Sequence, residues 1–261
     1  MLFDELDAKM RVFETNSDTC VLPHLFMVIR LDGRGFTKLT KEKHDFERPF
    51  DPKFRDLMIG TVQHLMTNCG FNVIYGFTES DEISLLCHPQ ENSFGRKTRK
   101  LLSILSGEAS AYFSLQLGAI GVFDSRISQL PRVQDVIDYF RWRAEDALRN
   151  ALNAHCYWLL RKEGQTAIQA SKALESLGIG DKNELLFQRN INFSSLPAWQ
   201  KRGIGLYWED YMKEGLNPKT QTTVLSQRRR IKVDMEIPTR NEYDLFIQNI
   251  VETALQSEIT T

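Results

Sequence analysis

The sequence has few cysteines, and they are too widely spaced to form a metal or redox site. Cys20, Cys69, Cys87 and Cys156 include no C-x-x-C pair. Structural zinc sites and dithiol redox centres typically need cysteines at such short spacing. The sequence therefore indicates reduced, mostly buried thiols and argues against a zinc knuckle.

The sequence also lacks a membrane signal and an excess of charge of one sign. Residues 1–14 are acidic and amphipathic, without the basic and apolar regions of a signal peptide. The most apolar long stretch, residues 101–123, contains serine, glutamate and glutamine side chains that a lipid-spanning helix would exclude. With 33 basic and 34 acidic residues, only a local basic patch could attract nucleic acid. We expect a cytoplasmic protein with no membrane partner.

Several catalytic motifs are missing as well. The chain has no G-x-S-x-G, no H-E-x-x-H, no G-x-x-x-x-G-K-[ST] and no G-x-G-x-x-G sequence. Its five histidines show no metal-ligand spacing, so each is better interpreted as a packing or surface residue. These absences leave little support for the chemistries that such motifs carry.

The hydrophobic pattern of the first half predicts a ferredoxin-like sheet. Short apolar runs rich in strand formers alternate with segments whose apolar residues have helical spacing. The predicted strands are residues 24–31, 71–77, 83–87 and 123–127, and the predicted helices are residues 49–68 and 97–117. Strand, helix, hairpin, helix, strand is the β-α-β-β-α-β order of a ferredoxin-like fold, an α/β (α+β) architecture.

The second half predicts a mostly helical lobe followed by a C-terminal extended segment. Residues 134–162, 166–177 and 182–187 have helical patterns, whereas residues 203–207 and 222–237 look extended. No linker rich in Pro, Gly and Ser separates the halves. We predict a catalytic domain over residues 1–135 and a second unit over 136–261 packed against it, or one continuous domain.

Two acidic residues lie next to the ends of apolar strands in the predicted sheet. Asp32 ends the first strand, and Asp81 lies in the hairpin tip. Strands one and three are central neighbours in a ferredoxin-like sheet, so these aspartates could meet at one edge. Converging carboxylates suit Mg²⁺, and two such ions can catalyse displacement at phosphorus. The alternative is that both are ordinary solvated turn residues.

Three basic segments stand out in the nearly neutral chain. They are Arg96, Lys97, Arg99 and Lys100; Lys38, Lys41, Lys43 and Arg48; and Arg228, Arg229, Arg230 and Lys232. The first lies at the start of a predicted helix, where backbone N–H groups favour anions. Together they predict contact with a polyanion such as RNA, unless they pair with the equally numerous acids.

Five short motifs occur in the order found in the tRNA(His) guanylyltransferase family. They are Arg30-Leu31-Asp32-Gly33-Arg34, Ser80-Asp81-Glu82, Phe123-Asp124-Ser125-Arg126, Tyr139-Phe140-Arg141-Trp142-Arg143 and Lys182-Asn183-Glu184-Leu185-Leu186-Phe187. The chain resembles this family over roughly residues 5–235. The resemblance implies a polymerase-like palm domain, a homotetramer, and tRNA and nucleoside triphosphates as partners.

The resemblance also implies roles for individual residues. Asp32, Asp81 and the Gly33 carbonyl would hold two Mg²⁺ ions, with the aspartates catalytic. The nucleotide or triphosphate would be bound by Arg30, Arg34, Gly35, Phe36, Arg48, Ser80, Lys182 and Asn183. RNA or phosphate would be bound by Arg96, Lys100, Arg126 and Asn150, to which the charge pattern adds Lys97, Arg228, Arg229 and Arg230.

One departure from the family pattern bears on function. The eukaryotic members have His-Ile-Asn-Asn where this chain reads Leu148-Arg149-Asn150-Ala151. The chain thus looks more like the guanylyltransferase-like branch, whose implied activity is template-dependent 3′-to-5′ repair of tRNA 5′ ends. ATP would activate a 5′-monophosphate before two-metal transfer from GTP or another nucleoside triphosphate. The alternatives are addition of one G to tRNA(His), a palm-type nucleotide cyclase, and a non-catalytic RNA-binding module.

Overall fold

The computed structural model describes residues 2–216 and 222–256, apart from the side chains of Lys43 and Leu216. The last residues of the predicted second unit, 257–261, lie outside this part. The helices are α1 (Phe3–Thr15), α2 (Phe36–Lys38), α3 (Pro52–Asn68), α4 (Thr98–Leu117), α5 (Val133–Lys162), α6 (Ala167–Glu175), α7 (Ile179–Phe187), α8 (Ala198–Arg202) and α9 (Arg240–Gln256). The strands are β1 (Phe26–Gly33), β2 (Val73–Glu79), β3 (Glu82–Cys87), β4 (Phe123–Leu130), β5 (Ile204–Leu216) and β6 (Thr223–Asp234). Short π and 3-10 turns occupy Leu39–Lys43, Ser93–Arg96 and Phe193–Ser195.

The sheet confirms the predicted ferredoxin-like topology and extends it. Its order is β4-β1-β3-β2-β5-β6, and the paired strands run antiparallel. The first four strands, with α3 and α4 as crossovers, have the predicted β-α-β-β-α-β order. β1 and β3 are central neighbours, so the end of β1 and the β2–β3 turn lie at the same end of the sheet.

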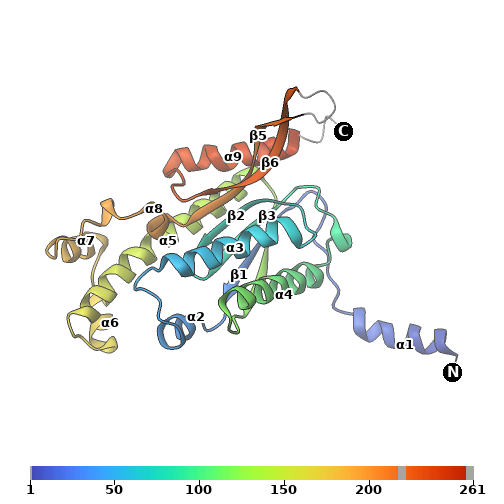
Figure 1. Ribbon diagram of the computed structural model, residues 1–261. Coiled ribbons are helices and arrows are strands. Elements are labelled where there is room, and N and C mark those ends of the chain that lie inside the picture. Colours follow the sequence, from blue (N-terminus) through green and yellow to red (C-terminus); the bar gives the residue numbers. More distant parts are fainter. Residues whose placement is uncertain (1, 217–221, 257–261) are drawn as a thin grey trace.

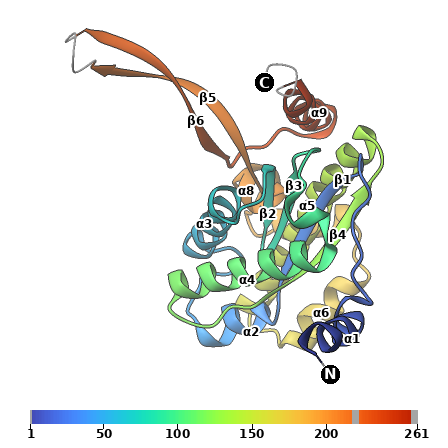
Figure 2. The same cartoon turned by 90° about the vertical axis from the view of Figure 1, so that its right-hand side faces the viewer.

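Helices cover both faces of this sheet (Figures 1 and 2). In β1, Met27, Ile29 and Leu31 belong to the cluster shared with α3 and α4, whereas Phe26 and Val28 belong to the cluster shared with α5 and α9. A strand buried on both faces reads as a continuous apolar run, which explains the unbroken pattern of residues 24–31.

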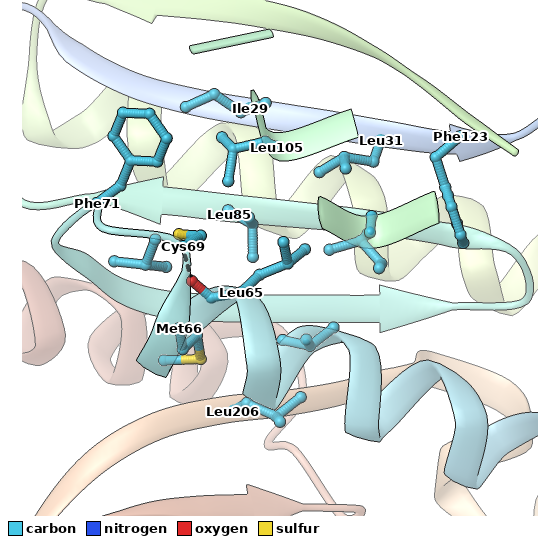
Figure 3. Packing of buried hydrophobic residues seen from close by; sticks show 14 of the residues in the cluster. Ile29, Leu31, Leu65, Met66, Cys69, Phe71, Leu85, Leu105, Phe123 and Leu206 are labelled. Carbon is cyan, nitrogen blue, oxygen red and sulfur yellow. Dashed lines mark hydrogen bonds between the residues drawn. The ribbon is translucent and has the colours of Figure 1, made fainter. Parts of the chain in front are cut away.

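The core on the α3–α4 side is closely packed. Figure 3 shows Leu65 of α3 and Leu105 of α4 directed toward Ile29 and Leu85 of the sheet. Leu206 of β5 joins the same cluster and is fully buried. A strand from the second half of the chain thus completes a core that the first half begins.

An aspartate cap fixes the start of α3. The Asp51 carboxylate accepts hydrogen bonds from the backbone N–H groups of Lys53 at 2.6 Å and Phe54 at 3.2 Å, and Pro52 takes the first helical position. The helix therefore begins at Pro52, not at the predicted residue 49. Asp51 also accepts the Glu47 N–H at 2.6 Å, which ties down the basic loop that precedes the helix.

The second half confirms the predicted helices and the extended segment at residues 222–237, but it also has structure that was not predicted. α5 is one 30-residue helix whose first half covers the sheet and whose second half packs with α6 and α7 in a separate helical cluster. β5 and β6 form a long hairpin that projects beyond the body of the molecule (Figure 2). The sequence indicated only the base of β5, and α9 was not predicted.

The two predicted units share one sheet, because β5 pairs with β2. The boundary at residue 135 falls at the start of α5. The division of the chain into two units at this residue stays a prediction. No helix within the described ranges is both long and apolar enough to cross a membrane.

His155 on α5 should make the fold sensitive to acid. Its ring lies 5.4 Å from that of Phe50 and 5.9 Å from that of Phe193, and burial lowers its pKa to about 4. The unfolded chain, with a pKa of about 6.5, takes up the proton first, so stability present above pH 6.5 is lost as pH falls toward 4. Between pH 7 and 5 this histidine should cost about 1 kcal/mol of unfolding free energy, since its ring is partly exposed and solvent weakens the effect of burial.

Urea unfolding at both pH values tests this. His155→Phe keeps an aromatic ring in the site and should show a smaller loss between pH 7 and 5 than the wild type. The control is exposed His24, whose positive φ suits asparagine: His24→Asn should leave the loss unchanged. Equal losses in His155→Phe and the wild type would contradict the assignment.

Candidate active site

The structure brings Asp32 and Asp81 together at one end of the sheet. Asp32 lies next to last in β1, and Asp81 lies in the two-residue turn between β2 and β3. Asp32 is in register with Glu82, directly after Asp81, and the Gly33 N–H donates to the Asp81 carbonyl at 3.0 Å. Both aspartates line the same pocket.

The environment of Asp81 suits a bound cation. Burial raises the pKa of its carboxyl to about 6, and the nearby Asp32 charge adds to this rise, while the Ser80 hydroxyl donates to Oδ1 at 3.1 Å. A divalent ion between the two carboxylates would relieve their repulsion. Across the described residues no group of three or more His, Cys, Asp or Glu side chains forms a metal cluster. Two carboxylates with backbone oxygen fit Mg²⁺, which completes its shell with phosphate and water.

The pocket joins these acids to a wall of cations and aromatic rings. It has a volume of about 440 Å³ and is bounded by the loop before α3, the β2–β3 turn, α5 and α8. Arg48 lies 4.8 Å from the centre of the Trp158 ring, and Lys41 lies 5.4 Å from it. On another wall, Arg55 lies 4.8 Å from the Trp199 ring. A pocket lined by both carboxylates and cations suits a triphosphate with its metal ions.

Three of the predicted binding residues line this pocket with the aspartates: Arg48, Ser80 and Asn150. Asn150 donates its side-chain amide to Asp146 at 3.2 Å. Lys41, Arg55, Trp158 and Trp199 were not singled out as site residues. They come from separate segments that only the fold assembles, so no local motif could have identified the last three.

A buried arginine that sequence reasoning also missed lies deeper in the pocket. Arg143 of α5 is 4% exposed and donates to Glu79 at 2.8 Å, to Asp146 at 3.2 Å and to Glu82. Burial raises the pKa of Glu79 to about 8, although the Arg143 charge opposes that rise. The signal was present in the Tyr139–Arg143 motif, which carried no assigned role.

Other predicted residues surround the pocket without lining it. Arg126 of β4 lies 3.9 Å from Asp32, and Arg30 lies 3.6 Å from Glu82. Arg34 and Gly35 are exposed just after β1. The Phe36 ring is 2% exposed and packs among other phenylalanines, so its side chain is part of the core and is closed to a nucleotide.

The basic group at the start of α4 is not brought to the pocket. Arg96 is buried and donates to the carbonyls of Leu25 and Pro89, beside the start of β1 and the end of β3. This is the opposite end of the sheet from the aspartates. Lys97 pairs with Asp18 at 3.4 Å, and Lys100 lies 5.6 Å from the Phe94 ring. The Arg96 guanidinium is thus occupied by backbone groups, which argues against its predicted phosphate role.

Two further predicted groups lie on separate surfaces. Lys182 and Asn183 belong to α7 in the helical lobe, and neither lines the aspartate pocket. Arg228, Arg229 and Arg230 lie on β6 of the projecting hairpin. A nucleotide or RNA phosphate that binds either group of residues must therefore bind outside the aspartate pocket.

Comparison with known proteins identifies relatives of the whole chain. A family model described as tRNAHis guanylyltransferase matches residues 7–131, and one described as Thg1 C terminal domain matches residues 134–248. The tRNA(His) guanylyltransferase of Debaryomyces hansenii is 30% identical over 230 residues, covering 82% of this chain and 86% of that protein.

Solved structures share the fold. Bacterial tRNA(His) guanylyltransferase-like protein in complex with ATP matches with a TM-score of 0.73 and 24% identity, covering 94% of this chain and 98% of that one. The same kind of protein in complex with GTP gives 0.71 and 24%, covering 95% and 99%. The architecture is a palm-type fold, and the protein is a nucleotidyltransferase. It belongs to the tRNA(His) guanylyltransferase family, as its motifs predicted.

Proposed function

We propose that this protein adds nucleotides to the 5′ end of tRNA in the 3′-to-5′ direction, using the opposing strand as template. The observation that carries this proposal is a pocket lined by the carboxylates of Asp32 and Asp81 together with the cations Arg48 and Lys41. The bacterial relatives in complex with ATP and GTP support nucleoside triphosphates as its ligands.

The proposed reaction has two phosphoryl transfers. First, the 5′-monophosphate of the RNA attacks the α-phosphate of ATP, giving a 5′-adenylylated end and pyrophosphate. The 3′-hydroxyl of an incoming nucleoside triphosphate then attacks the activated 5′ phosphate, and AMP leaves. Such reactions depend mainly on positioning and on charge stabilisation.

The pocket residues supply both the positioning and the charge stabilisation. Mg²⁺ held by Asp32, Asp81 and the Gly33 carbonyl would lower the pKa of the attacking hydroxyl and neutralise phosphate charge. Arg48 and Lys41, which line the same pocket, hold phosphate oxygens, and contact with the Trp158 ring limits their motion. The Ser80 hydroxyl adds a donor beside Asp81.

Residues 148–151 favour templated repair over addition of a single untemplated G. Leu148 and Ala151 replace the first and last residues of the eukaryotic His-Ile-Asn-Asn stretch, so α5 offers no histidine there. Addition of G to tRNA(His) remains a second candidate, because the curated relatives bear that name.

Extension of a tRNA that lacks its first nucleotide separates the two. Each nucleoside triphosphate is offered in turn to substrates that differ only in the opposing base. Incorporation that follows the opposing base is expected. Addition of G alone, whatever base it faces, would support the second candidate. Cyclic nucleotide formed without RNA, or RNA binding without any incorporation, would overturn both.

The β5–β6 hairpin should bind tRNA phosphates. Arg229 lies 4.8 Å from the Trp208 ring and Arg230 lies 4.7 Å from the Tyr211 ring, so the guanidinium groups are held along the projecting ribbon. Replacing Arg228, Arg229 and Arg230 together by alanine should weaken tRNA binding. The slope of log affinity against log salt should become shallower by up to about 2, as expected for three lost phosphate contacts.

Filter binding at several salt concentrations measures this slope. Exposed Arg11 and Arg132, replaced together by alanine, provide a control away from the hairpin and should leave the slope unchanged. A wild-type slope in the hairpin variant would contradict the prediction.

The homotetramer and the cytoplasmic location stay predictions.

A further inference from the structure

A single buried guanidinium joins α5 to both ends of the turn that carries Asp81. Arg143 contacts Glu79, the last residue of β2, and Glu82, the first residue of β3. Only Ser80 and Asp81 lie between these glutamates, and Ser80 has a positive φ of 47°. The position of Asp81 is therefore fixed by the two residues that Arg143 holds.

Without Arg143 the two glutamates would be buried side by side with no shared hydrogen-bond donor. Glu79 and Glu82 are directly paired across the hairpin, and their side chains are only 10% and 18% exposed. A buried carboxyl group that lacks a hydrogen-bond partner destabilises the fold, so the two side chains would move apart to reach water. Among the residues that the structure describes, Arg143 contacts both glutamates, whereas Arg30 reaches Glu82 alone at 3.6 Å.

The same contacts extend to Asp32. Glu82 is in β-sheet register with Asp32, so a shift of the turn moves Asp81 relative to β1. On the helix side, Asp146 receives hydrogen bonds from Arg143 and Asn150, at 3.2 Å each. Through these contacts, Arg143 on α5 influences the distance between Asp32 and Asp81.

We propose that Arg143 is a positioning residue, which sets the distance between Asp32 and Asp81 for a divalent cation by clamping Glu79 and Glu82. It does not itself contact the ion. This inference rests on the metal site of the proposed function. Residues that orient metal ligands commonly change affinity by about 10- to 100-fold when removed.

Mn²⁺ binding, measured by electron paramagnetic resonance without nucleotide or RNA, tests the inference independently of activity. Arg143→Met should weaken Mn²⁺ binding at least about 10-fold and raise the Mg²⁺ concentration needed for half-maximal transfer in parallel. Arg143→Lys should be intermediate, because one ammonium keeps the charge but loses the fork geometry. Circular dichroism establishes that each variant is folded.

A second change separates positioning from general destabilisation. Arg143→Met with Glu79→Gln gives the hairpin an amide that can donate a hydrogen bond to Glu82, and should recover part of the Mn²⁺ affinity. If Arg143→Met does not fold, this double variant and Arg143→Lys are compared with the wild type instead, and both should bind Mn²⁺ more weakly. Arg149→Met is the matched control: Arg149 also contacts Asp146, but it is 74% exposed and does not contact the glutamates.

The outcomes distinguish this inference from the proposed function. Folded Arg143 variants that bind Mn²⁺ as tightly as the wild type would overturn the inference alone. A wild-type protein that binds Mn²⁺ no better than Asp32→Asn would overturn the metal site, and with it the clamp. Weakening by Arg149→Met equal to that of Arg143→Met would also count against the clamp, since the hairpin contacts would then be irrelevant.

Discussion

Asp32→Asn and Asp81→Asn should each reduce nucleotide transfer at least about 10³-fold, a loss of about 4 kcal/mol in transition-state stabilisation. Each change removes a carboxylate that lines the pocket and preserves the size of the side chain. The fold should be retained, because neither residue belongs to the hydrophobic clusters. In metal-free buffer, Asp81→Asn should unfold at an equal or higher urea concentration, since it removes a like charge beside Asp32.

Asp124 provides the matched control. It is the direct neighbour of Asp32 in β-sheet register, but its side chain is 60% exposed and lies outside the pocket. Asp124→Asn should retain transfer within a few-fold of the wild type, as measured by 5′ extension of labelled tRNA. Near-normal transfer in either pocket variant, or an equal loss in Asp124→Asn, would show that the carboxylate pair does not act as the metal site.

The strand order and the meeting of the two aspartates were accessible from the sequence because both depend on local patterns. Alternating and continuous apolar runs identified the first four strands, and their order left one arrangement for a ferredoxin-like sheet. Asp32 and Asp81 are placed by strand ends and need no long-range side-chain contact. Their position therefore followed from the fold class.

The pocket wall could not be derived in this way. Trp158 lies on α5 and Trp199 on α8, and each faces the site only because α5 crosses the sheet and α8 returns to it. Charge patterns were a weaker guide still. Arg96 looked like a phosphate ligand at a helix start, yet its guanidinium is bonded to the carbonyls of Leu25 and Pro89. The sequence alone does not show which charged side chains the fold buries.

The β5–β6 hairpin shows the same limit on a larger scale. β6 is mostly exposed and includes three consecutive arginines, because most of the hairpin extends beyond the core (Figure 2). Residues 222–237, which include β6, were predicted as extended, but of β5 only the base was predicted, where Leu206 packs on the core. α9, by contrast, has a regular buried stripe that includes Tyr243, Ile247 and Val251, and its helical spacing was overlooked.

Gly33→Ala should reduce transfer by at least about 100-fold, because this position has no room for a side chain. A β-carbon there would lie 2.6 Å from the Phe36 ring and 2.9 Å from the β-carbon of Asp81. Phe36 is buried among Phe54, Phe113 and Phe123 and cannot yield easily. The strain must therefore push the Asp81 turn away from β1, which separates the two carboxylates. Overpacking of this kind also costs about 1–3 kcal/mol of stability.

Gly107→Ala on α4 is the control, since a β-carbon there meets nothing within 4 Å and alanine favours a helix. It should keep wild-type transfer and unfold at an equal or slightly higher urea concentration. The decisive comparison is Mn²⁺ affinity in folded protein. If the turn is displaced, Gly33→Ala should bind Mn²⁺ more weakly than the wild type even at temperatures where it is fully folded. Weak transfer with unchanged Mn²⁺ binding would instead place the effect of Gly33 on the nucleotide or the RNA end, and the close approach of β1 to the Asp81 turn would then not be what organises the metal site.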